Sequence, residues 1–382
     1  MAAPLEGILV ADFTRVLAGP LATMTLADLG ARVIKVERPG SGDDTRLWGP
    51  PWSEHSATYF ESVNRSKESV TLDLQDADDL ALARELAHRA DVVVDNFKVG
   101  TMSRLGLDQA SLAPANPGVI CCSITGFGSG AGAGLLGYDF LVQAVGGLMS
   151  ITGEPGRPTK VGVALVDVLT GKDAVIGILA ALHARATTGR GQAIEVSLLT
   201  SLLGALANQA QSSLQTGHDP AGMGNRHPSI APYETLACAD GELAVACGNQ
   251  GQFARMATVL GAPELATDPR FADNAARVAH RDELTGRLEE LLAGATVDRW
   301  VTALTEADVP AGRVGTISQA IELADRLGLQ PLTEVGAGYA PQVRHPVAWP
   351  QPLPPSTPPP RLGADDAAVR RWLATPLPDT AG

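Results

Sequence analysis

The sequence predicts an α/β protein, with a large domain built on a mainly parallel sheet and a smaller α+β domain. Two observations support this. In the first 197 residues, short apolar runs alternate with segments of helical periodicity, the order in which parallel sheets covered by helices are built. After Gly217 the alternation ends, and Asp240-Gly241 stands between two alternating runs, a pattern typical of a β-hairpin.

The elements of the large domain are assigned from the spacing of their apolar residues. Short β-branched runs indicate strands, and longer segments with apolar residues three or four positions apart indicate helices. The expected strands are 7–13, 31–36, 69–74, 91–97, 118–124 and 192–196, and the expected helices are 21–29, 76–89, 167–186 and 198–215.

The second part of the chain predicts a small α+β domain. A hairpin of 233–239 and 242–247 precedes helices at 252–260, 274–292 and 297–306. We therefore divide the chain into a large domain (1–197), a linker helix (198–224), a small domain (225–308) and a final segment (309–382).

Composition excludes several classes of protein. Of 382 residues, 45% are hydrophobic and 19% charged, which is typical of a well-packed globular protein. The formal net charge of −13 argues against binding to nucleic acid or to anionic membranes. No apolar run reaches the roughly 20 residues that span a bilayer. The N-terminus lacks the basic and apolar regions of a signal peptide, so we expect a cytoplasmic protein.

Two further features of the composition have structural consequences. Residues 352–360 contain six prolines, so we expect an extended strap over the surface. The four cysteines lack metal-site spacing, and no metal site is predicted. We interpret them as reduced structural thiols; they are Cys121, Cys122, Cys238 and Cys247.

Asp167 is the leading candidate for a catalytic residue. It follows the apolar run 163–166 at the start of a predicted helix. A carboxylate in such surroundings loses much of its water, so its pKa rises unless donors stabilise the charge. This is one way in which an aspartate becomes a nucleophile. The structural alternative is that Asp167 only caps the helix that follows.

Blocks of sequence along nearly the whole chain resemble the class III CoA-transferases, the formyl-CoA transferase or CaiB/BaiF family. The resemblance implies a Rossmann-like sheet, a C-terminal segment that returns to the large domain, and a homodimer of interlocked rings. It also implies acyl-CoA and a small carboxylic acid as substrates, with no permanently bound cofactor. The matching blocks are 11–20, 30–40, 64–69, 94–102, 137–171, 224–228 and 307–314.

The same resemblance implies a tract of residues that binds CoA. Arg38 ends a predicted strand, at the sheet edge where α/β proteins bind ligands. Taken singly, each of these residues is equally well explained as an ordinary surface residue. The implied CoA-binding residues are Val16, Arg38, Leu72, Asn96, Phe97 and Arg104.

A second group is implied to surround the reacting acyl group. Leu17 stands where formyl-CoA transferases have glutamine, which argues against oxalate and formate as substrates. Tyr138 stands where racemases of the family have histidine, which favours transfer over racemisation. Arg226 is a candidate for binding the free carboxylate of a dicarboxylic acyl group; His227 beside it is interpreted as structural. The implied pocket residues are Leu17, Tyr59, Tyr138, Asp139, Gly248 and Arg226.

The sequence therefore predicts a CoA-transferase in which Asp167 forms mixed-anhydride and thioester intermediates, with succinyl-CoA as a candidate donor. The alternatives are an acyl-CoA racemase or epimerase of the same family, and a non-catalytic acyl-CoA-binding protein. A dehydrogenase is disfavoured, because the first turn (14–20) has one glycine instead of the three that let a dinucleotide approach the backbone.

Overall fold

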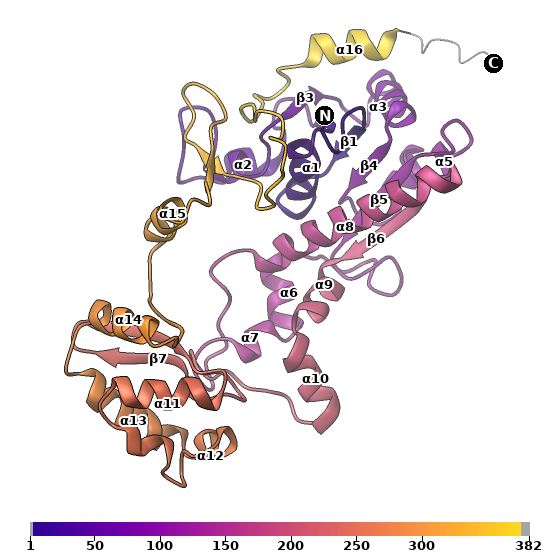
Figure 1. Ribbon diagram of the computed structural model, residues 1–382. Helices are drawn as coiled ribbons and strands as arrows, with labels where there is room; N and C mark the ends of the chain where they lie inside the picture. The colour runs from indigo at the N-terminus through magenta and orange to yellow at the C-terminus, as the bar shows by residue number, and fades with distance from the viewer. Residues whose placement is uncertain (1–2, 376–382) are drawn as a thin grey trace. The chain divides into compact units, whose positions relative to one another are not determined.

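The computed structural model describes residues 3–375, which form two compact units (Figure 1). The first unit contains the chain up to Leu148, residues 160–218 and the chain from Gln330 onward. The second contains Met149–Thr159 and Asp219–Leu329. The chain thus leaves the first unit and comes back twice, first for the short segment Met149–Thr159 and then for Asp219–Leu329.

A six-stranded, fully parallel sheet forms the centre of the first unit, in the order β3-β2-β1-β4-β5-β6. Its strands alternate in sequence with helices, as predicted, and their ends differ from the expected ones by a few residues. The strands are β1 (Leu9–Phe13), β2 (Arg32–Glu37), β3 (Lys67–Thr71), β4 (Val92–Asp95), β5 (Ile120–Thr125) and β6 (Ala193–Ser197).

Helices cover both faces of this sheet because its strands are apolar on both sides. Along β4, Val92 and Val94 belong to one core and Val93 to the other. The adjacent Cys121 and Cys122 are likewise divided between the two cores. One face packs against α1 (Ala18–Asp28), α8 (Leu165–Thr188) and α9 (Leu198–Ala205), and the other against α3 (Ala77–Arg89) and α16 (Asp366–Ala374).

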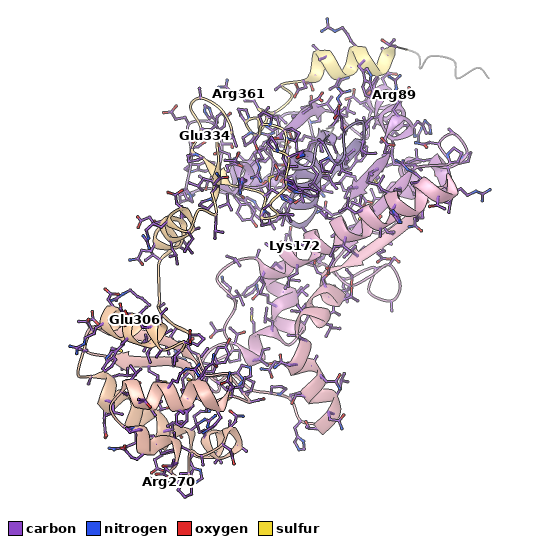
Figure 2. All side chains as sticks on the ribbon, in the orientation of Figure 1. Arg89, Lys172, Arg270, Glu306, Glu334 and Arg361 are labelled. Atoms are coloured by element: carbon purple, nitrogen blue, oxygen red, sulfur yellow. The ribbon has the colours of Figure 1, made fainter. Side chains whose placement is uncertain are left out.

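The C-terminal helix α16 is fastened to α3 and to the sheet edge. Arg89, labelled in Figure 2, donates to the carbonyl oxygens of Trp372, Leu373 and Thr375. Its guanidinium lies over the Trp372 ring. The smaller elements of this unit are η1 (Asp44–Leu47), α2 (Thr58–Glu61), α4 (Thr101–Leu105), α5 (Gln109–Leu112), α6 (Asp139–Val145), α10 (Ala207–Thr216), β10 (Leu332–Thr333) and β11 (Gln342–Val343).

The second unit has an antiparallel sheet of order β7-β8-β9 and its own apolar core. The predicted hairpin is β7 (Tyr233–Cys238) and β8 (Gly241–Ala246), and the third strand was not predicted. Its other elements are β9 (Ala311–Arg313), α11 (Gln250–Val259), η2 (Pro263–Ala266), α12 (Asn274–Ala279), α13 (Arg281–Leu292), α14 (Val297–Glu306) and α15 (Ile317–Arg326); α7 (Leu148–Ile151) lies at the junction.

Two predicted helices are each broken into a pair, so the expectation of single helices at 198–215 and 274–292 is wrong. The first ends before Ala207, whose φ of +42° lies outside the right-handed helical region. The second is interrupted at His280, whose φ of −112° and ψ of 31° are not helical. Among residues 3–375, no helix is both long and apolar enough to cross a membrane.

Candidate active site

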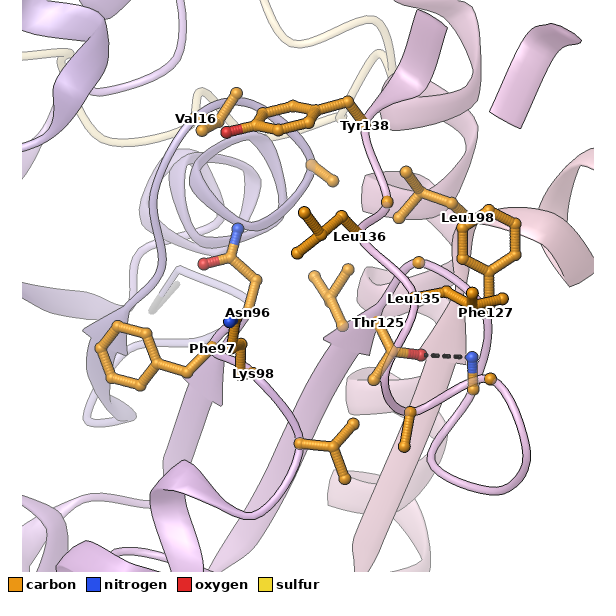
Figure 3. A pocket seen from close by; sticks show the side chains of 18 of the residues that line it. Val16, Asn96, Phe97, Lys98, Thr125, Phe127, Leu135, Leu136, Tyr138 and Leu198 are labelled. Atoms are coloured by element: carbon orange, nitrogen blue, oxygen red, sulfur yellow. Dashed lines mark hydrogen bonds between the residues drawn. The ribbon is translucent and has the colours of Figure 1, made fainter. Parts of the chain in front are cut away.

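A cavity of about 370 Å³ opens in the first unit where strands β1, β4 and β5 end (Figure 3). The chain runs from β1 through β2 to β3 and then returns to the other side of β1 to form β4. Such a switch point at the carboxyl ends of parallel strands is the usual place for a ligand in an open α/β sheet. The walls are Arg15–Ala18, Asn96–Val99, Ile124–Gly128, Gly132–Tyr138, Asp44, Asp167 and Leu198.

A smaller cavity of about 200 Å³ lies beside the first and shares two residues with it, Arg15 and Phe97. Because Arg15 and Phe97 line both, the two cavities are direct neighbours at the ends of β1 and β4. The other walls of the smaller cavity are residues 13–14, 35–38, 42–43 and 72–75.

Asp167 enters the larger cavity from the first turn of α8, where its own side chain is not the helix cap. The N-cap position is Ala164, which has no capping side chain. Instead, Oδ1 of Asp139 accepts the N–H groups of Val166 at 2.7 Å and Asp167 at 3.2 Å. The capping role that was considered for Asp167 therefore belongs to Asp139, and the Asp167 carboxylate is left for other chemistry.

The Asp167 side chain is largely buried at the cavity wall and lacks a hydrogen-bond donor from the described part of the protein. The residue is 8% exposed, and among residues 3–375 no donor hydrogen bonds to its carboxylate. Burial, assisted by the negative charge of Asp139, raises the pKa of Asp167 to about 7. Near neutral pH, a substantial fraction is therefore ionised, and that ionised form has few partners to weaken it as a nucleophile.

Tyr59 and Tyr138 differ in their relation to the cavity. Burial, together with the charges of Asp167 and Asp139, raises the pKa of Tyr59 to about 12, so its hydroxyl keeps its proton. Tyr59 packs edge-on against Trp48 and does not line the larger cavity. Tyr138 does line it, is 59% exposed, and lies near Val16 in Figure 3.

Most of the sequence-predicted CoA residues lie along the two cavities. Val16, Asn96 and Phe97 line the larger one, and Arg38, Leu72 and Phe97 line the smaller. Leu17 also lines the larger cavity. Arg104, in α4, lines neither.

Sequence reasoning missed two cations that line the larger cavity, Arg15 and Lys98. Both were adjacent in sequence to residues that it selected, Val16 and Phe97, and that adjacency was the available signal. Arg15 also stacks over the Phe97 ring, with its guanidinium carbon 5.4 Å from the ring centre.

Arg226 and Gly248 belong to the second unit, apart from the residues above. Arg226 is engaged by two carboxylates, with Nη1 2.8 Å from Asp282 and Nε 3.3 Å from Glu234. The Gly248 N–H donates to Oε1 of Gln252 at 2.8 Å. Their predicted roles at the substrate stay predictions.

Comparisons with known proteins identify the family. The model of CoA-transferase family III matches residues 5–366, so the chain belongs to CoA-transferase family III. Among curated relatives, the succinate–glutarate CoA-transferase of Agrobacterium fabrum is 44% identical over 97% of this chain and 96% of its own length. The acetyl-CoA:oxalate CoA-transferase of Acetobacter aceti is 41% identical over 98% and 96%.

The structural comparison agrees. A crystal structure of a CaiB/BaiF family protein from Brucella suis is 44% identical and superposes with a TM-score of 0.87, covering 98% of this chain and all of that one (100%). The resemblance identified from the sequence blocks is thus confirmed, and with it the enzyme class, a CoA-transferase.

Proposed function

We propose that this enzyme moves CoA from a short dicarboxylyl-CoA, with succinyl-CoA as the leading candidate, to a small carboxylic acid, and that Asp167 carries the acyl and CoA groups. The observation that supports this most strongly is the Asp167 carboxylate itself: it lines a cavity, is 8% exposed, and has a raised pKa. The names of the Agrobacterium relative and of the human succinyl-CoA:glutarate CoA-transferase, 41% identical over 82% of this chain, support dicarboxylic substrates.

CoA fits the two cavities as one extended ligand. The smaller cavity, with Leu72 and the Phe97 ring as apolar walls and Arg38 at its edge, suits the adenosine end. Arg15, which lines both cavities, is placed to meet the phosphates between that end and the pantetheine arm. The thiol end then lies in the larger cavity with Asp167.

The reaction begins with Asp167 attacking the donor thioester carbonyl. The C–S bond breaks, and an aspartyl–acyl anhydride and CoA thiolate result. The thiolate then attacks the aspartyl carbonyl, which forms an aspartyl-CoA thioester and releases the donor acid. This route keeps the energy of the thioester in a covalent bond, where hydrolysis would lose it.

The second half mirrors the first. The acceptor carboxylate attacks the aspartyl-CoA carbonyl and displaces CoA thiolate, giving a second anhydride. The thiolate attacks the acceptor's carbonyl, and the new acyl-CoA leaves with Asp167 restored as a carboxylate. No proton needs to be moved, which fits the absence of a histidine at the position of Tyr138.

Intact-protein mass spectrometry tests the covalent mechanism. We expect wild-type protein incubated with succinyl-CoA to gain the mass of CoA through a thioester, and hydroxylamine to remove it and leave a hydroxamate at Asp167. Asp167→Ala should gain nothing, while Asp173→Ala, four residues beyond the first turn of the same helix, should behave as wild type. Wild-type protein that turns over succinyl-CoA without any adduct at Asp167 would refute the covalent role.

The racemase alternative and the oligomeric state each have a direct test. Deuterium uptake at the α-carbon of a 2-methylacyl-CoA would support racemisation, and its absence during CoA transfer would exclude it. From the family resemblance, we also propose a cytoplasmic homodimer of interlocked rings. Light scattering after gel filtration should then give twice the mass of one chain, 39.5 kDa.

A further inference from the structure

Val16, at the wall of the larger cavity, has a backbone conformation that valine avoids. Its φ is +72°, and among residues 3–375 it is the only β-branched residue with a positive φ. In this left-handed region, the Cβ of an L-residue crowds its own backbone, and branching at Cβ makes the crowding worse. Such a conformation persists only where the surroundings impose it.

Side chains from distant segments bind the backbone of this turn. The Arg15 N–H donates to Oδ1 of Asn96 at 2.9 Å, and the Arg15 carbonyl accepts from Nδ2 of Asn96 at 2.6 Å. The Val16 N–H donates to Oδ1 of Asp43 at 3.3 Å. The two peptide groups that precede the Val16 Cα, 14–15 and 15–16, are therefore held from outside the turn. On the other side, Leu17 leads directly into α1.

Lys35 connects this clamp to the sheet. Its Nζ donates to the carbonyl of Thr14 at 2.8 Å and lies 2.9 Å from Oδ2 of Asp43. The two oxygens of Asp43 therefore have different partners. Oδ2 faces the Lys35 ammonium, and Oδ1 accepts the Val16 N–H together with the N–H and hydroxyl of Thr45, at 3.0 and 2.8 Å. Its own N–H is fixed by Oε2 of Glu37 at 3.0 Å.

The Lys35–Asp43 pair is difficult to explain by stability alone. Both side chains are 0% exposed, and a buried ion pair is often no more stabilising than apolar side chains of the same volume. Burial lowers the pKa of Lys35, but the nearby carboxylates of Asp43, Asp12 and Glu37 together raise it by more. The net pKa is above its usual value, so the ammonium stays charged. What the pair does achieve is a fixed position for the carbonyl of Thr14 and the N–H of Val16.

We propose that the buried Lys35–Asp43 pair, with Asn96, is a positioning device that holds Val16 in the left-handed conformation and so shapes the turn Thr14–Leu17 to receive CoA. The proposal rests on the proposed function, since it takes the turn as part of the CoA site. It also gives Asn96 a different task from the one predicted: its amide binds the turn, and CoA meets the surface that the turn presents.

Asp43→Asn is the most informative substitution. It preserves the size of the side chain, but an amide has one acceptor oxygen and cannot serve both Lys35 and the Val16 N–H. The substitution is made in three backgrounds: wild type, Val16→Gly and Val16→Ala. Glycine adopts a positive φ without strain, whereas alanine removes the same methyl groups and keeps the strain.

The dissociation constant for CoA, measured by isothermal titration calorimetry, is the readout. We expect Asp43→Asn to weaken CoA binding about tenfold in wild type and in Val16→Ala, because the turn relaxes away from its binding shape. In Val16→Gly, the same substitution should change binding by no more than about twofold, since glycine needs no clamp.

An equal loss in all three backgrounds would overturn the proposal, because a merely structural pair has no reason to interact with the φ preference of residue 16. If Asp43→Asn does not fold, the melting temperatures of Val16→Gly and Val16→Ala test whether residue 16 is strained. Strain at this position predicts that the glycine variant melts at the higher temperature. An equal or lower value would overturn the proposal. A wild type that does not bind CoA would instead refute the proposed function, and the melting comparison would still test the strain.

Discussion

At the scale of single residues, two carboxylates at the start of α8, those of Asp139 and Asp167, differ in their surroundings. Asp139 is hydrogen bonded by two N–H groups of α8 and by Nε2 of Gln143 at 2.6 Å. Asp167, in the first turn of α8, has no such donor to its carboxylate within residues 3–375, and its pKa is raised. Burial, with the charge of Asp139 as a second cause, keeps the pKa of Asp167 high.

Asp139→Asn tests this electrostatic relation. The amide oxygen of asparagine still accepts the N–H groups of Val166 and Asp167, but the negative charge is gone. Since the pKa of Asp167 is raised, its reactive ionised form appears as pH rises through about 7. Removing the charge should lower that pKa, so the acidic limb of the kcat/KM profile should move to lower pH by about one unit.

The matched control for Asp139→Asn is Asp108→Asn, which changes an aspartate that caps α5 by accepting the Ser111 N–H. We expect its pH profile to follow wild type. An Asp139→Asn profile that also follows wild type, in a folded protein, would show that Asp139 serves only as a helix cap.

The local sequence pattern left a cap and a nucleophile open for Asp167, because both need an aspartate at a helix start, and only the family resemblance favoured the nucleophile. The structure adds that the cap is Asp139, which lies 28 residues away and accepts the N–H of Asp167. Asp139 was itself assigned to the substrate pocket, but its carboxylate is occupied by the helix and it does not line the larger cavity. Contacts between distant residues are not present in local sequence patterns.

At the scale of elements, the site depends on how closely α8 approaches α1. Gly171 lies one turn beyond Asp167, and a Cβ there would meet the carbonyl oxygen of Ala18 at 2.7 Å. Ala18 lines the larger cavity and follows directly on the turn Thr14–Leu17, so this contact sets how closely α8, which carries Asp167, approaches that turn. A backbone atom cannot move aside as the end of a long side chain can.

Gly171→Ala should therefore push the two helices apart. We expect a loss of about 1–3 kcal/mol in the free energy of unfolding and a fall in kcat, measured by urea titration and steady-state kinetics. Gly204→Ala in α9 is the control, since a Cβ there meets nothing within 4 Å and should cost no stability. Equal stability of the two variants would contradict the tight packing.

Helices and strands were predicted correctly where a periodic pattern of apolar residues extends over many positions. The missed strand β9 and the missed helix break at Ala207 each have a local cause. The strand β9 is three residues long, Ala311–Arg313, too short to alternate visibly, and it pairs with β8 across more than 60 residues of chain. The break before Ala207 interrupts a run that contains no proline, and its one glycine, Gly204, lies inside α9, so composition could not locate the break.

At the scale of the whole molecule, a parallel sheet gathers residues from many parts of the chain at one edge. The alternation of strands and helices predicted a mainly parallel sheet, and in the structure the segments after β1, β4 and β5 line the larger cavity. From the resemblance we expected a final segment, 309–382, that returns to the large domain; in the structure the chain rejoins the first unit at Gln330. That path depends on contacts such as those of Arg89 with α16, which join residues nearly 300 positions apart.

The central claim is that the donor and the acceptor each form a covalent anhydride with the Asp167 carboxylate. Transfer of ¹⁸O from the acceptor to Asp167 tests it most directly. The enzyme is incubated with succinyl-CoA and an acceptor acid whose carboxylate carries ¹⁸O in both positions. In each turnover, one labelled oxygen should bridge the second anhydride and remain on Asp167 when CoA thiolate attacks. Peptide mass spectrometry should find ¹⁸O in the peptide that contains Asp167, and later turnovers should pass it to released succinate. Product acyl-CoA formed with no ¹⁸O in Asp167 or in succinate would contradict the account.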